Sequence, residues 1–172
     1  MRIFLIGFMG SGKSHVGKRL AKTLSYEFID ADQHLEEQSG MSISDIFATR
    51  GEGGFRNLES AALKSLGTKS NCIISTGGGA PCFFDNMEWM NANGVTVYLK
   101  VAPAILLERL LPRTENRPLL IGKSPEELEA FIKTSLVERA SFYEQAEIIL
   151  NQTTIDMDRV ALLQNALKEH LL

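Results

Sequence analysis

Eight residues near the start of the chain, GFMGSGKS at positions 7–14, restrict the local fold more than any other segment. They follow the apolar run RIFLI and precede a segment with helical periodicity. The run fits the spacing GxxxxGK[ST], with Gly7, Gly12, Lys13 and Ser14 at the fixed positions. Glycines allow successive backbone N–H groups to face inward, and the following helix directs its positive end to the same point. The segment therefore predicts a strand, a phosphate-binding loop and a helix.

The residues of this loop have separate chemical roles. Lys13 would place a positive charge on the outer phosphates, and the Ser14 hydroxyl would ligate Mg²⁺. The candidate nucleotide-binding residues are Gly10, Ser11, Gly12, Lys13, Ser14 and, in the first helical turn, His15. The alternative is a glycine-rich turn that carries a lysine by chance. The order of strand, loop and helix favours phosphate binding.

Five short apolar segments alternate with helical ones along the chain. The candidate strands are Ile3–Ile6, Glu27–Ile29, Cys72–Thr76, Val95–Val101 and Glu147–Leu150. The clearest helices are Gly12–Leu24, Ser124–Tyr143 and Asp156–Leu171. The second of these opens with Ser-Pro-Glu-Glu, which is typical of a capping box. Strands that alternate with helices, with no hairpin signal between them, predict an α/β fold with a parallel sheet.

The overall composition limits the classes of protein to consider. Hydrophobic residues make up 44% of the 172 residues, which is enough for the core of one domain. A net charge of −3 argues against a general nucleic-acid binder. No apolar run approaches the roughly 18 residues of a membrane span. The two cysteines, Cys72 and Cys82, form no CxxC pair, which fits a reducing compartment. We expect a cytoplasmic protein without nucleic-acid or membrane partners.

Two aspartates, Asp30 and Asp32, close the second candidate strand in the run FIDADQHLEE. If the strand includes both, their side chains point to one face, at the strand end where parallel sheets bind ligands. One carboxylate could then hold Mg²⁺ through water while the other accepts a proton from an attacking hydroxyl. The alternative is that Asp32 caps a helix that starts at Gln33, with Asp30 as a turn residue.

The third candidate strand ends in three consecutive glycines, Gly77, Gly78 and Gly79. A strand end without side chains lets the backbone approach a small ligand closely. The alternative is a tight turn before Ala80 and Pro81, but such a turn requires fewer than three glycines. We therefore interpret the three glycines as part of a substrate site.

Three arginines could bind an anionic ligand: Arg56, Arg117 and Arg139. A guanidinium group is planar and always charged, so it can bind a carboxylate or phosphate through two parallel hydrogen bonds. Each arginine could equally lie on the surface and pair with a nearby acid. The acids in reach along the sequence are Glu59, Glu115 and Glu138. For each arginine taken alone, the surface pair is the expected arrangement.

The segment 111–123, LPRTENRPLLIGK, interrupts the alternation of helices and strands. It contains two prolines, one glycine, two arginines and one lysine, and it lies between two strongly periodic helices. A polar connection of this length inside a compact domain is typical of a functional loop or of a solvated one. We interpret it as a lid.

Taken together and in order, these motifs resemble the shikimate kinase family. The resemblance rests on GFMGSGKS, DAD at 30–32, FR at 55–56 with Glu59, STGGG, NRPLL and RASFY, and it extends from Arg2 to about Leu150. It implies a single domain over residues 1–172, a three-layer αβα fold of the P-loop NTPase type with a five-stranded parallel sheet. A substrate-binding region at about 32–60 and a mobile lid at about 112–123 are also implied.

The resemblance implies a reaction as well. Enzymes of this family use MgATP to phosphorylate the 3-hydroxyl of shikimate, a step of the chorismate pathway to aromatic amino acids. Small members of the family are often monomers, and we expect a monomer here.

On the nucleotide side, the resemblance assigns roles by position. Lys13 and Ser14 serve the phosphates and Mg²⁺, and Asp30 holds the metal through water. Arg113 stacks near the adenine. Arg117, from the lid, bridges the transferred phosphate and the substrate, and with Lys13 it is a candidate catalytic residue.

On the acceptor side, the resemblance assigns the remaining residues. Asp32 binds the shikimate hydroxyls and acts as the base. Arg56 and Arg139 hold the substrate carboxylate, and the Gly78 N–H meets a hydroxyl. The apolar side of the ring pocket is lined by Phe47 and Phe55.

Three other classes of protein stay open. A gluconate-type kinase shares the fold and a related loop, but its acceptor site need not contain three glycines. An adenylate-type kinase would require a nucleoside monophosphate as acceptor. A nucleotide-switched binding module would favour a guanine-reading NKxD segment, which the sequence lacks.

Overall fold

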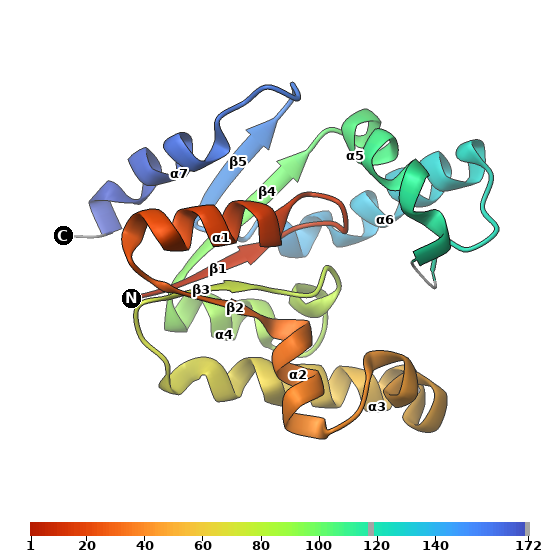
Figure 1. Cartoon of the computed structure of the whole chain (residues 1–172), viewed down its shortest axis with the longest axis horizontal. Coiled ribbons are helices and arrows are strands. Elements are labelled where there is room, and N and C mark those ends of the chain that lie inside the picture. The colour runs from red at the N-terminus through yellow and green to blue at the C-terminus, as the bar shows by residue number, and fades with distance from the viewer. Residues whose placement is uncertain (117–118, 171–172) are drawn as a thin grey trace.

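The structure is a computed structural model that describes residues 1–116 and 119–170, and its strands form one parallel sheet (Figure 1). The strands are β1 (Arg2–Ile6), β2 (Glu27–Asp30), β3 (Cys72–Ser75), β4 (Val95–Val101) and β5 (Ile148–Gln152). They lie in the order β2-β3-β1-β4-β5, and every neighbouring pair is parallel. The predicted five-stranded parallel sheet is confirmed.

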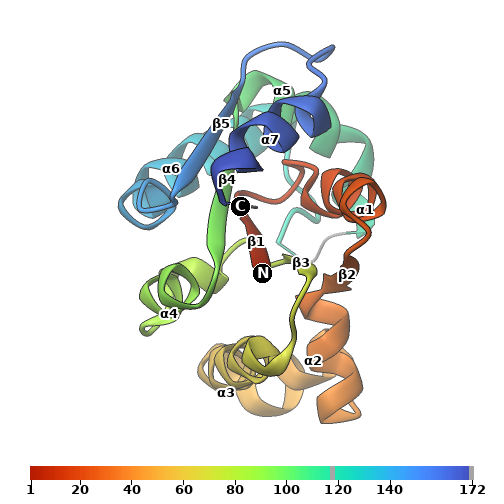
Figure 2. The same ribbon diagram turned by 90° about the vertical axis from the view of Figure 1, so that its left-hand side faces the viewer.

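Helices cover both faces of this sheet. The α-helices are α1 (Lys13–Leu24), α2 (Ala31–Ser39), α3 (Ile43–Ser65), α4 (Asn86–Asn93), α5 (Pro103–Leu110), α6 (Pro125–Tyr143) and α7 (Arg159–Leu167). Short 3₁₀ helices span Leu66–Thr68, Ala80–Cys82, Leu111–Asn116 and Lys168–His170. α1 and α7 pack on one face, and α3, α4 and α6 on the other (Figure 2). The three-layer αβα arrangement is also confirmed.

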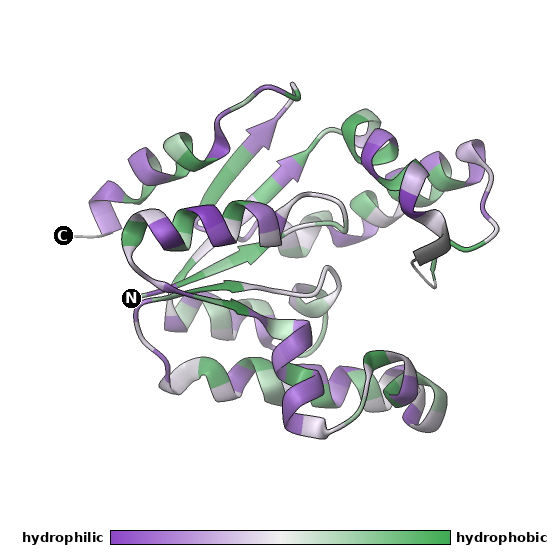
Figure 3. Cartoon of the chain, viewed as in Figure 1, coloured by the Kyte–Doolittle hydropathy of each residue, from purple (hydrophilic) through white to green (hydrophobic). Residues whose placement is uncertain are grey.

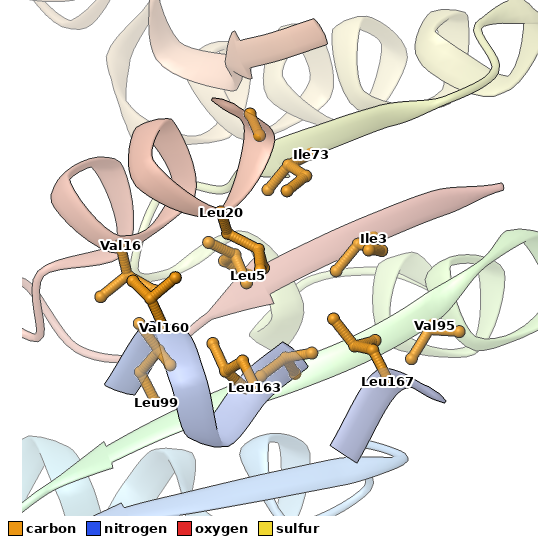
Figure 4. Close-up of a cluster of buried hydrophobic side chains, with 12 residues drawn as sticks. Ile3, Leu5, Val16, Leu20, Ile73, Val95, Leu99, Val160, Leu163 and Leu167 are labelled. Carbon is orange, nitrogen blue, oxygen red and sulfur yellow. The ribbon is translucent and has the colours of Figure 1, made fainter. Parts of the chain in front are cut away.

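Alternate residues of β1 face opposite layers, as the two-residue period of a strand requires. Ile3 and Leu5 pack against α1 and α7, where they meet Leu20 and Leu163 (Figure 4). Phe4 faces the opposite layer. Hydrophobic residues therefore dominate the strands, whereas the helices carry both hydrophobic and hydrophilic residues (Figure 3). In the ranges that the structure covers, no helix is long and apolar enough to cross a membrane.

α1 approaches the sheet closely at Gly17. A Cβ atom at this position would lie 2.6 Å from a ring carbon of Phe28 and 3.1 Å from a methyl of Leu5. These distances are too short for any larger residue to fit without a shift. The close approach brings the first turn of α1 against the end of β3, where the hydroxyl oxygens of Ser14 and Ser75 are 3.3 Å apart.

Most predicted boundaries differ from the structure by one or two residues, and the largest difference lies at the last helix. The predicted helix Asp156–Leu171 begins three residues too early, because α7 starts at Arg159. The Asp158 side chain accepts a hydrogen bond from a backbone N–H of the first turn at 3.2 Å, which fixes this start. A 3₁₀ turn to His170 follows α7, and the rest of the predicted helix lies outside the described residues.

The segment predicted to be a lid begins as a short helix. α5 continues directly into the 3₁₀ helix that ends at Asn116, and residues 119–122 form turns. Leu120 is fully buried against α5 and α6, whereas Leu119 and Ile121 are 61% and 64% exposed. This part of the segment is therefore anchored at one residue and presents apolar side chains to solvent on either side of it.

The capping box predicted at the start of α6 is present. The Ser124 hydroxyl accepts a hydrogen bond from the Glu127 N–H at 3.1 Å. In return the Glu127 carboxylate accepts one from the Ser124 N–H at 2.8 Å. These reciprocal bonds satisfy N–H groups that a helix start otherwise leaves free.

Ser124→Ala removes one bond of this pair. We expect the free energy of unfolding, measured by urea denaturation, to fall by about 1 kcal/mol. Ser141→Ala, an exposed position near the other end of α6, is the matched control and should change the same quantity by less than about 0.5 kcal/mol. Equal losses in the two variants would contradict the capping role.

Candidate active site

A cleft of about 790 Å³ lies where the phosphate-binding loop meets the carboxyl ends of β2 and β3. Open parallel sheets bind their ligands at this end. The lining residues are Met9, Gly10, Gly12, Lys13, Ser14, His15, Lys18, Asp30, Asp32, Ser75, Thr76, Gly77, Gly78, Arg109, Arg113 and Arg159. The structure thus brings the predicted loop residues other than Ser11, both aspartates, two of the three glycines and Arg113 to one cavity.

The loop between β1 and α1 has the conformation that its glycines predict. Gly7, Gly10 and Gly12 have φ angles of 143°, 79° and 88°, which side-chain-bearing residues rarely adopt. Gly12 is the N-cap of α1 and offers no side-chain acceptor, so the first N–H groups of the helix stay available to a ligand. The Lys13 ammonium lies over the loop and donates to the carbonyls of Gly7 at 2.8 Å and Phe8 at 3.1 Å. The result is a concave, positively charged surface suited to phosphate.

Asp30 uses both carboxylate oxygens. Oδ1 accepts from the N–H groups of Asp32 at 3.1 Å and Gln33 at 3.4 Å, so Asp30 caps α2. Oδ2 accepts from the Ser14 hydroxyl at 3.2 Å, and that hydroxyl is also 3.3 Å from the one of Ser75. Three oxygen-bearing side chains therefore converge beside the start of α1.

Two expectations about this pair of aspartates are wrong. β2 ends at Asp30, and Asp32 lies in the first turn of α2, so strand alternation does not relate the two side chains. The alternative in which Asp32 is the helix cap is also wrong, because Asp30 is the cap. The chain can enter a helix directly after Asp30 since that carboxylate satisfies the N–H groups of the first turn. Both side chains nevertheless line the cleft.

The surroundings of Asp32 disfavour its charged form. Burial, and after it the nearby charge of Asp30, raise the pKa of Asp32, while Lys13 and Arg56 act in the opposite direction. Its carboxylate packs against the strand end, where a Cβ atom on Gly77 would lie 3.0 Å from Oδ1. A carboxylate with a raised pKa in a cleft is suited to accept a proton from a substrate.

Arg56 and Glu59 form a buried ion pair. Nη1 of Arg56 lies 2.8 Å from Oε2 of Glu59, and the two side chains are 14% and 7% exposed. The guanidinium packs over the Phe83 ring at 4.0 Å, and its Nε is buried without an acceptor among the described residues. Burial raises the pKa of Glu59, although Arg56 opposes the shift. The predicted partner of Arg56 is correct, but the predicted surface location is wrong.

Phe47 and Phe55, the predicted apolar side of the pocket, stack on each other. Their ring centroids are 4.4 Å apart, and they are 41% and 5% exposed. In a continuous helix, residues eight apart are separated by about 12 Å along the axis. The stack is possible because α3 is broken at Gly51, where φ is 66°. Phe55 also lies 5.0 Å from the Arg56 guanidinium, which joins this aromatic pair to the ion pair.

The glycines that end β3 are required mainly by close packing. A Cβ atom on Gly79 would lie 2.7 Å from both terminal nitrogens of Arg56, and one on Gly77 would lie 2.8 Å from Oε1 of Glu59. Gly78 has more room, since its nearest atoms would be 3.4 Å away. The tight turn considered as an alternative is also present, as the Ala80 N–H donates to the Gly77 carbonyl at 3.2 Å. Side chains of α2 and α3 thus occupy the space that side chains of β3 would need.

Arg139 reaches this strand end from α6. Its Nη1 donates to the Tyr143 hydroxyl at 3.4 Å, and a Cβ atom on Gly78 would lie 3.5 Å from the same nitrogen. Its guanidinium packs over the Phe8 ring at 5.2 Å. Within the part of the chain that is described, its hydrogen bond goes to Tyr143 and not to Glu138.

The predicted lid contains two arginines, of which the structure describes one. Arg113 belongs to the 3₁₀ helix after α5 and lines the cleft. Arg117 lies outside the described residues.

Two arginines outside every predicted motif lie against the phosphate-binding loop. Arg159 Nη1 donates to the Ser11 carbonyl at 2.5 Å, and Arg109 Nη1 donates to the Gly10 carbonyl at 3.2 Å. A Cβ atom on Gly12 would lie 2.8 Å from the Arg159 guanidinium, so this glycine is needed for packing as well as for its backbone angle. Ser11, in contrast to its neighbours, is fully buried and does not line the cleft.

No local pattern marks these two arginines. They lie 99 and 148 residues from their loop partners, and the order of the sheet is what brings α5 and α7 beside the loop. Burial lowers the pKa of Arg159 to about 10, with further contributions from the charges of Arg109 and Arg19. The capping aspartate before Arg159 is the one sequence signal that could have placed it at a helix start.

Known proteins of one family are similar to this chain over most of its length. A family model described as shikimate kinase matches residues 9–168. The shikimate kinase of Parabacteroides distasonis is 52% identical over 147 residues, which is 86% of this chain and 85% of that protein. The crystal structure of shikimate kinase from Bacteroides thetaiotaomicron has a TM-score of 0.89 at 44% identity and covers 99% of this chain and 98% of its own.

A third similar protein was solved with a ligand. It is the shikimate kinase of Acinetobacter baumannii in complex with shikimate, with a TM-score of 0.83 at 35% identity, covering 99% of this chain and 92% of that one. These matches extend over almost the whole chain, including both walls of the cleft. The chain belongs to the shikimate kinase family.

Proposed function

We propose that this protein transfers the γ-phosphoryl group of ATP to the 3-hydroxyl of shikimate, giving shikimate 3-phosphate and ADP, in the pathway to chorismate and the aromatic amino acids. The observation that carries the proposal is that one cleft holds phosphate-binding and acceptor-binding elements together. Lys13 of the loop, Asp32 of α2 and Gly78 of the strand end all line it. Membership of the family, and the shikimate bound to the Acinetobacter baumannii relative, support the choice of acceptor.

On the donor side, the loop N–H groups and Lys13 bind the phosphates. The pairing of Ser14 with Asp30 at 3.2 Å fits a Mg²⁺ site, because this ion takes a few protein oxygens and completes its shell with phosphate oxygens and water. The Ser14 hydroxyl would ligate the ion, and Asp30 would hold it through water. When bound, Mg²⁺ supplies positive charge to the β- and γ-phosphates. Arg113 would contact the adenine, and Gly10, Gly12 and His15 complete the nucleotide site, to which the buried Ser11 contributes no side chain.

On the acceptor side, Arg56 and Arg139 bind the shikimate carboxylate. The buried Arg56 Nε, which has no acceptor in the described ranges, is a donor that a carboxylate would satisfy. Asp32 binds the reacting hydroxyl and accepts its proton. Phe47 and Phe55 line the apolar face of the ring, and the N–H groups of the strand end, Gly77, Gly78 and Gly79, complete the pocket.

The chemistry that these residues supply is mostly positioning and charge neutralisation. Phosphoryl transfer spreads negative charge over the moving group, so the cations around it lower the barrier. Lys13 supplies such a cation, and Arg117, which lies outside the described residues, would supply another from the lid. Closure of the lid, which is formed by residues at about 112–123, would exclude the water that competes with shikimate.

The wider setting is part of the same proposal. The chain acts as one kinase domain. Residues at about 32–60 form the acceptor region, and residues at about 112–123 form the lid. It works as a cytoplasmic monomer whose partners are small molecules.

The proposed reaction is tested by ADP release. The purified protein is supplied with MgATP and, separately, with shikimate, gluconate or AMP, and ADP is followed by a coupled assay. We expect rapid release with shikimate and only background release with the other two. Turnover of gluconate or AMP in preference to shikimate would assign the protein to another kinase class. Nucleotide-dependent partner binding without any kinase activity would indicate a switch.

Lys13→Ala tests the donor side. We expect kcat to fall by about 100-fold or more, because one cation that stabilises the transferred group is lost. Circular dichroism should stay native. Lys22→Ala, an exposed lysine at the other end of α1, is the control and should retain wild-type kinetics. A folded Lys13→Ala variant with wild-type turnover would refute the role of this lysine.

Gly79→Ala tests the steric argument for the acceptor wall. Gly79 has φ −87° and ψ −18°, so alanine can adopt its backbone, and the three atoms nearest the new methyl all belong to the guanidinium of Arg56. We expect a folded protein whose KM for shikimate rises about tenfold or more, while KM for ATP is unchanged. Ser70→Ala, exposed before the opposite end of β3, should leave both values unchanged. Equal effects of Gly79→Ala on both substrates would argue against displacement of Arg56.

Asp32→Asn should separate activity from stability. The pKa of Asp32 is raised above 3.8 in the folded protein, so ionisation above that pH favours the unfolded chain and lowers stability as the pH rises. We expect the variant to have a higher free energy of unfolding than the wild type near pH 7. The difference should shrink as the pH falls toward 3.8, the value for the unfolded chain. Turnover should fall by about 100-fold or more, because the base is lost. A variant that is less stable than the wild type at neutral pH would contradict the destabilising effect of the Asp32 charge.

A further inference from the structure

The hydroxyl group of Tyr143 connects two parts of the acceptor site. Tyr143 is the last residue of α6 and is fully buried. Its hydroxyl donates to the Gly78 carbonyl at 2.5 Å and accepts a hydrogen bond from Arg139 Nη1 at 3.4 Å. The donor and the acceptor of both hydrogen bonds are certain, because a carbonyl can only accept and a guanidinium can only donate. The single phenolic proton is therefore committed to Gly78.

All three glycine carbonyls at the end of β3 are held in this way. The carbonyls of Gly77 and Gly79 accept from N–H groups of the following 3₁₀ turn, at 3.2 and 2.9 Å. The carbonyl of Gly78 accepts from Tyr143, a side chain that reaches it from another layer of the fold. In a planar trans peptide the carbonyl of one residue and the N–H of the next point in opposite directions. Holding the first two carbonyls therefore sets the directions of the Gly78 and Gly79 N–H groups.

Neither of these two N–H groups has an acceptor among the residues described. Gly78 lines the cleft, and Gly79 packs on the guanidinium of Arg56. A glycine–glycine peptide has no Cβ atom on either side to restrict its rotation. The Tyr143 hydroxyl is thus the group that keeps the peptide between Gly78 and Gly79 in one orientation.

We propose that Tyr143 is a positioning residue of the acceptor site. Its hydroxyl holds the Gly78–Gly79 peptide so that the Gly79 N–H is presented to an oxygen of the acceptor, and it orients Arg139 at the same time. This inference rests on the proposed function. Burial also raises the pKa of Tyr143, so the phenol keeps the proton that it donates at the pH of ordinary assays.

Tyr143→Phe tests the inference because it removes one oxygen atom and keeps the ring. Tyr98→Phe is the matched control. Tyr98 is 4% exposed, its ring lies 4.9 Å from that of Tyr143, and within the described ranges its hydroxyl has no hydrogen bond to the acceptor site. Both variants lose a phenolic hydroxyl and keep a ring in the core, and only one of these hydroxyls touches Gly78.

The readout is steady-state kinetics of the full chain with each substrate varied in turn. For Tyr143→Phe we expect KM for shikimate to rise about tenfold, as for the loss of a hydrogen bond that orients a ligand, with KM for ATP changed less than about twofold. Tyr98→Phe should leave both values at the wild-type level. An unchanged KM for shikimate in Tyr143→Phe overturns the inference. So does an equal rise for both substrates, or the same rise in Tyr98→Phe, since each of these indicates general loosening of the core.

A second measurement uses the wild-type protein and does not depend on the folding of a variant. Amide hydrogen exchange, followed by NMR on ¹⁵N-labelled protein, reports directly on the Gly79 N–H. We expect saturating shikimate to slow its exchange about tenfold or more and a non-hydrolysable ATP analogue to leave it unchanged. No protection of the Gly79 N–H by shikimate overturns the inference.

The proposed function and this inference fail in different ways. If the wild-type protein does not turn over shikimate, the function is wrong. If it does, and Tyr143→Phe matches it in KM for both substrates, the positioning role alone is wrong.

Discussion

The proposed acceptor wall, formed by the three glycines after β3 with Asp32, Arg56 and Glu59, depends on the absence of side chains where β3 ends. At Gly77 and Gly79 a single methyl group would meet Glu59 or Arg56 at less than 3 Å. Because that space is empty of β3 side chains, a half-buried acid from α2 and a buried ion pair from α3 can lie directly on the strand end. The three elements thus form one surface, and a change at any of them displaces the others.

The cleft has an excess of positive side chains, although the chain as a whole carries a net negative charge. The protein carries a formal net charge of −3, yet the cleft is lined by Lys13, Lys18, Arg109, Arg113 and Arg159 and by only two carboxylates within the described residues. Desolvation works against several of these groups, since it raises the pKa of Asp32 and lowers that of Arg159. A nucleotide triphosphate and a divalent cation would supply the opposite charges. The site is therefore built for ligands at some cost to the stability of the protein without them.

The sequence predicted features whose cause is local. The phosphate-binding loop, the capping box of α6 and the parallel sheet each follow from a few neighbouring residues or from a periodic pattern. The predictions were wrong where the same local pattern was compatible with two structures. Asp30 and Asp32 suit a strand or a helix cap, and the choice depended on which carboxylate reached the free N–H groups. The stack of Phe47 on Phe55 depends on the break at Gly51, and glycine permits such a break without fixing where in a helix it falls.

The sequence by itself determined the phosphate-binding loop, because consecutive residues build it and their spacing encodes its geometry. Only the tertiary structure decided the acceptor wall and the two arginines behind the loop. Arg109 and Arg159 meet the loop only after β4 and β5 have paired beside β1. Burial likewise turned the pair of Arg56 and Glu59 from an ordinary helix-surface contact into a part of the site. Contacts between distant segments, and the desolvation that packing imposes, exist only in the folded chain, and for this reason no motif recorded them.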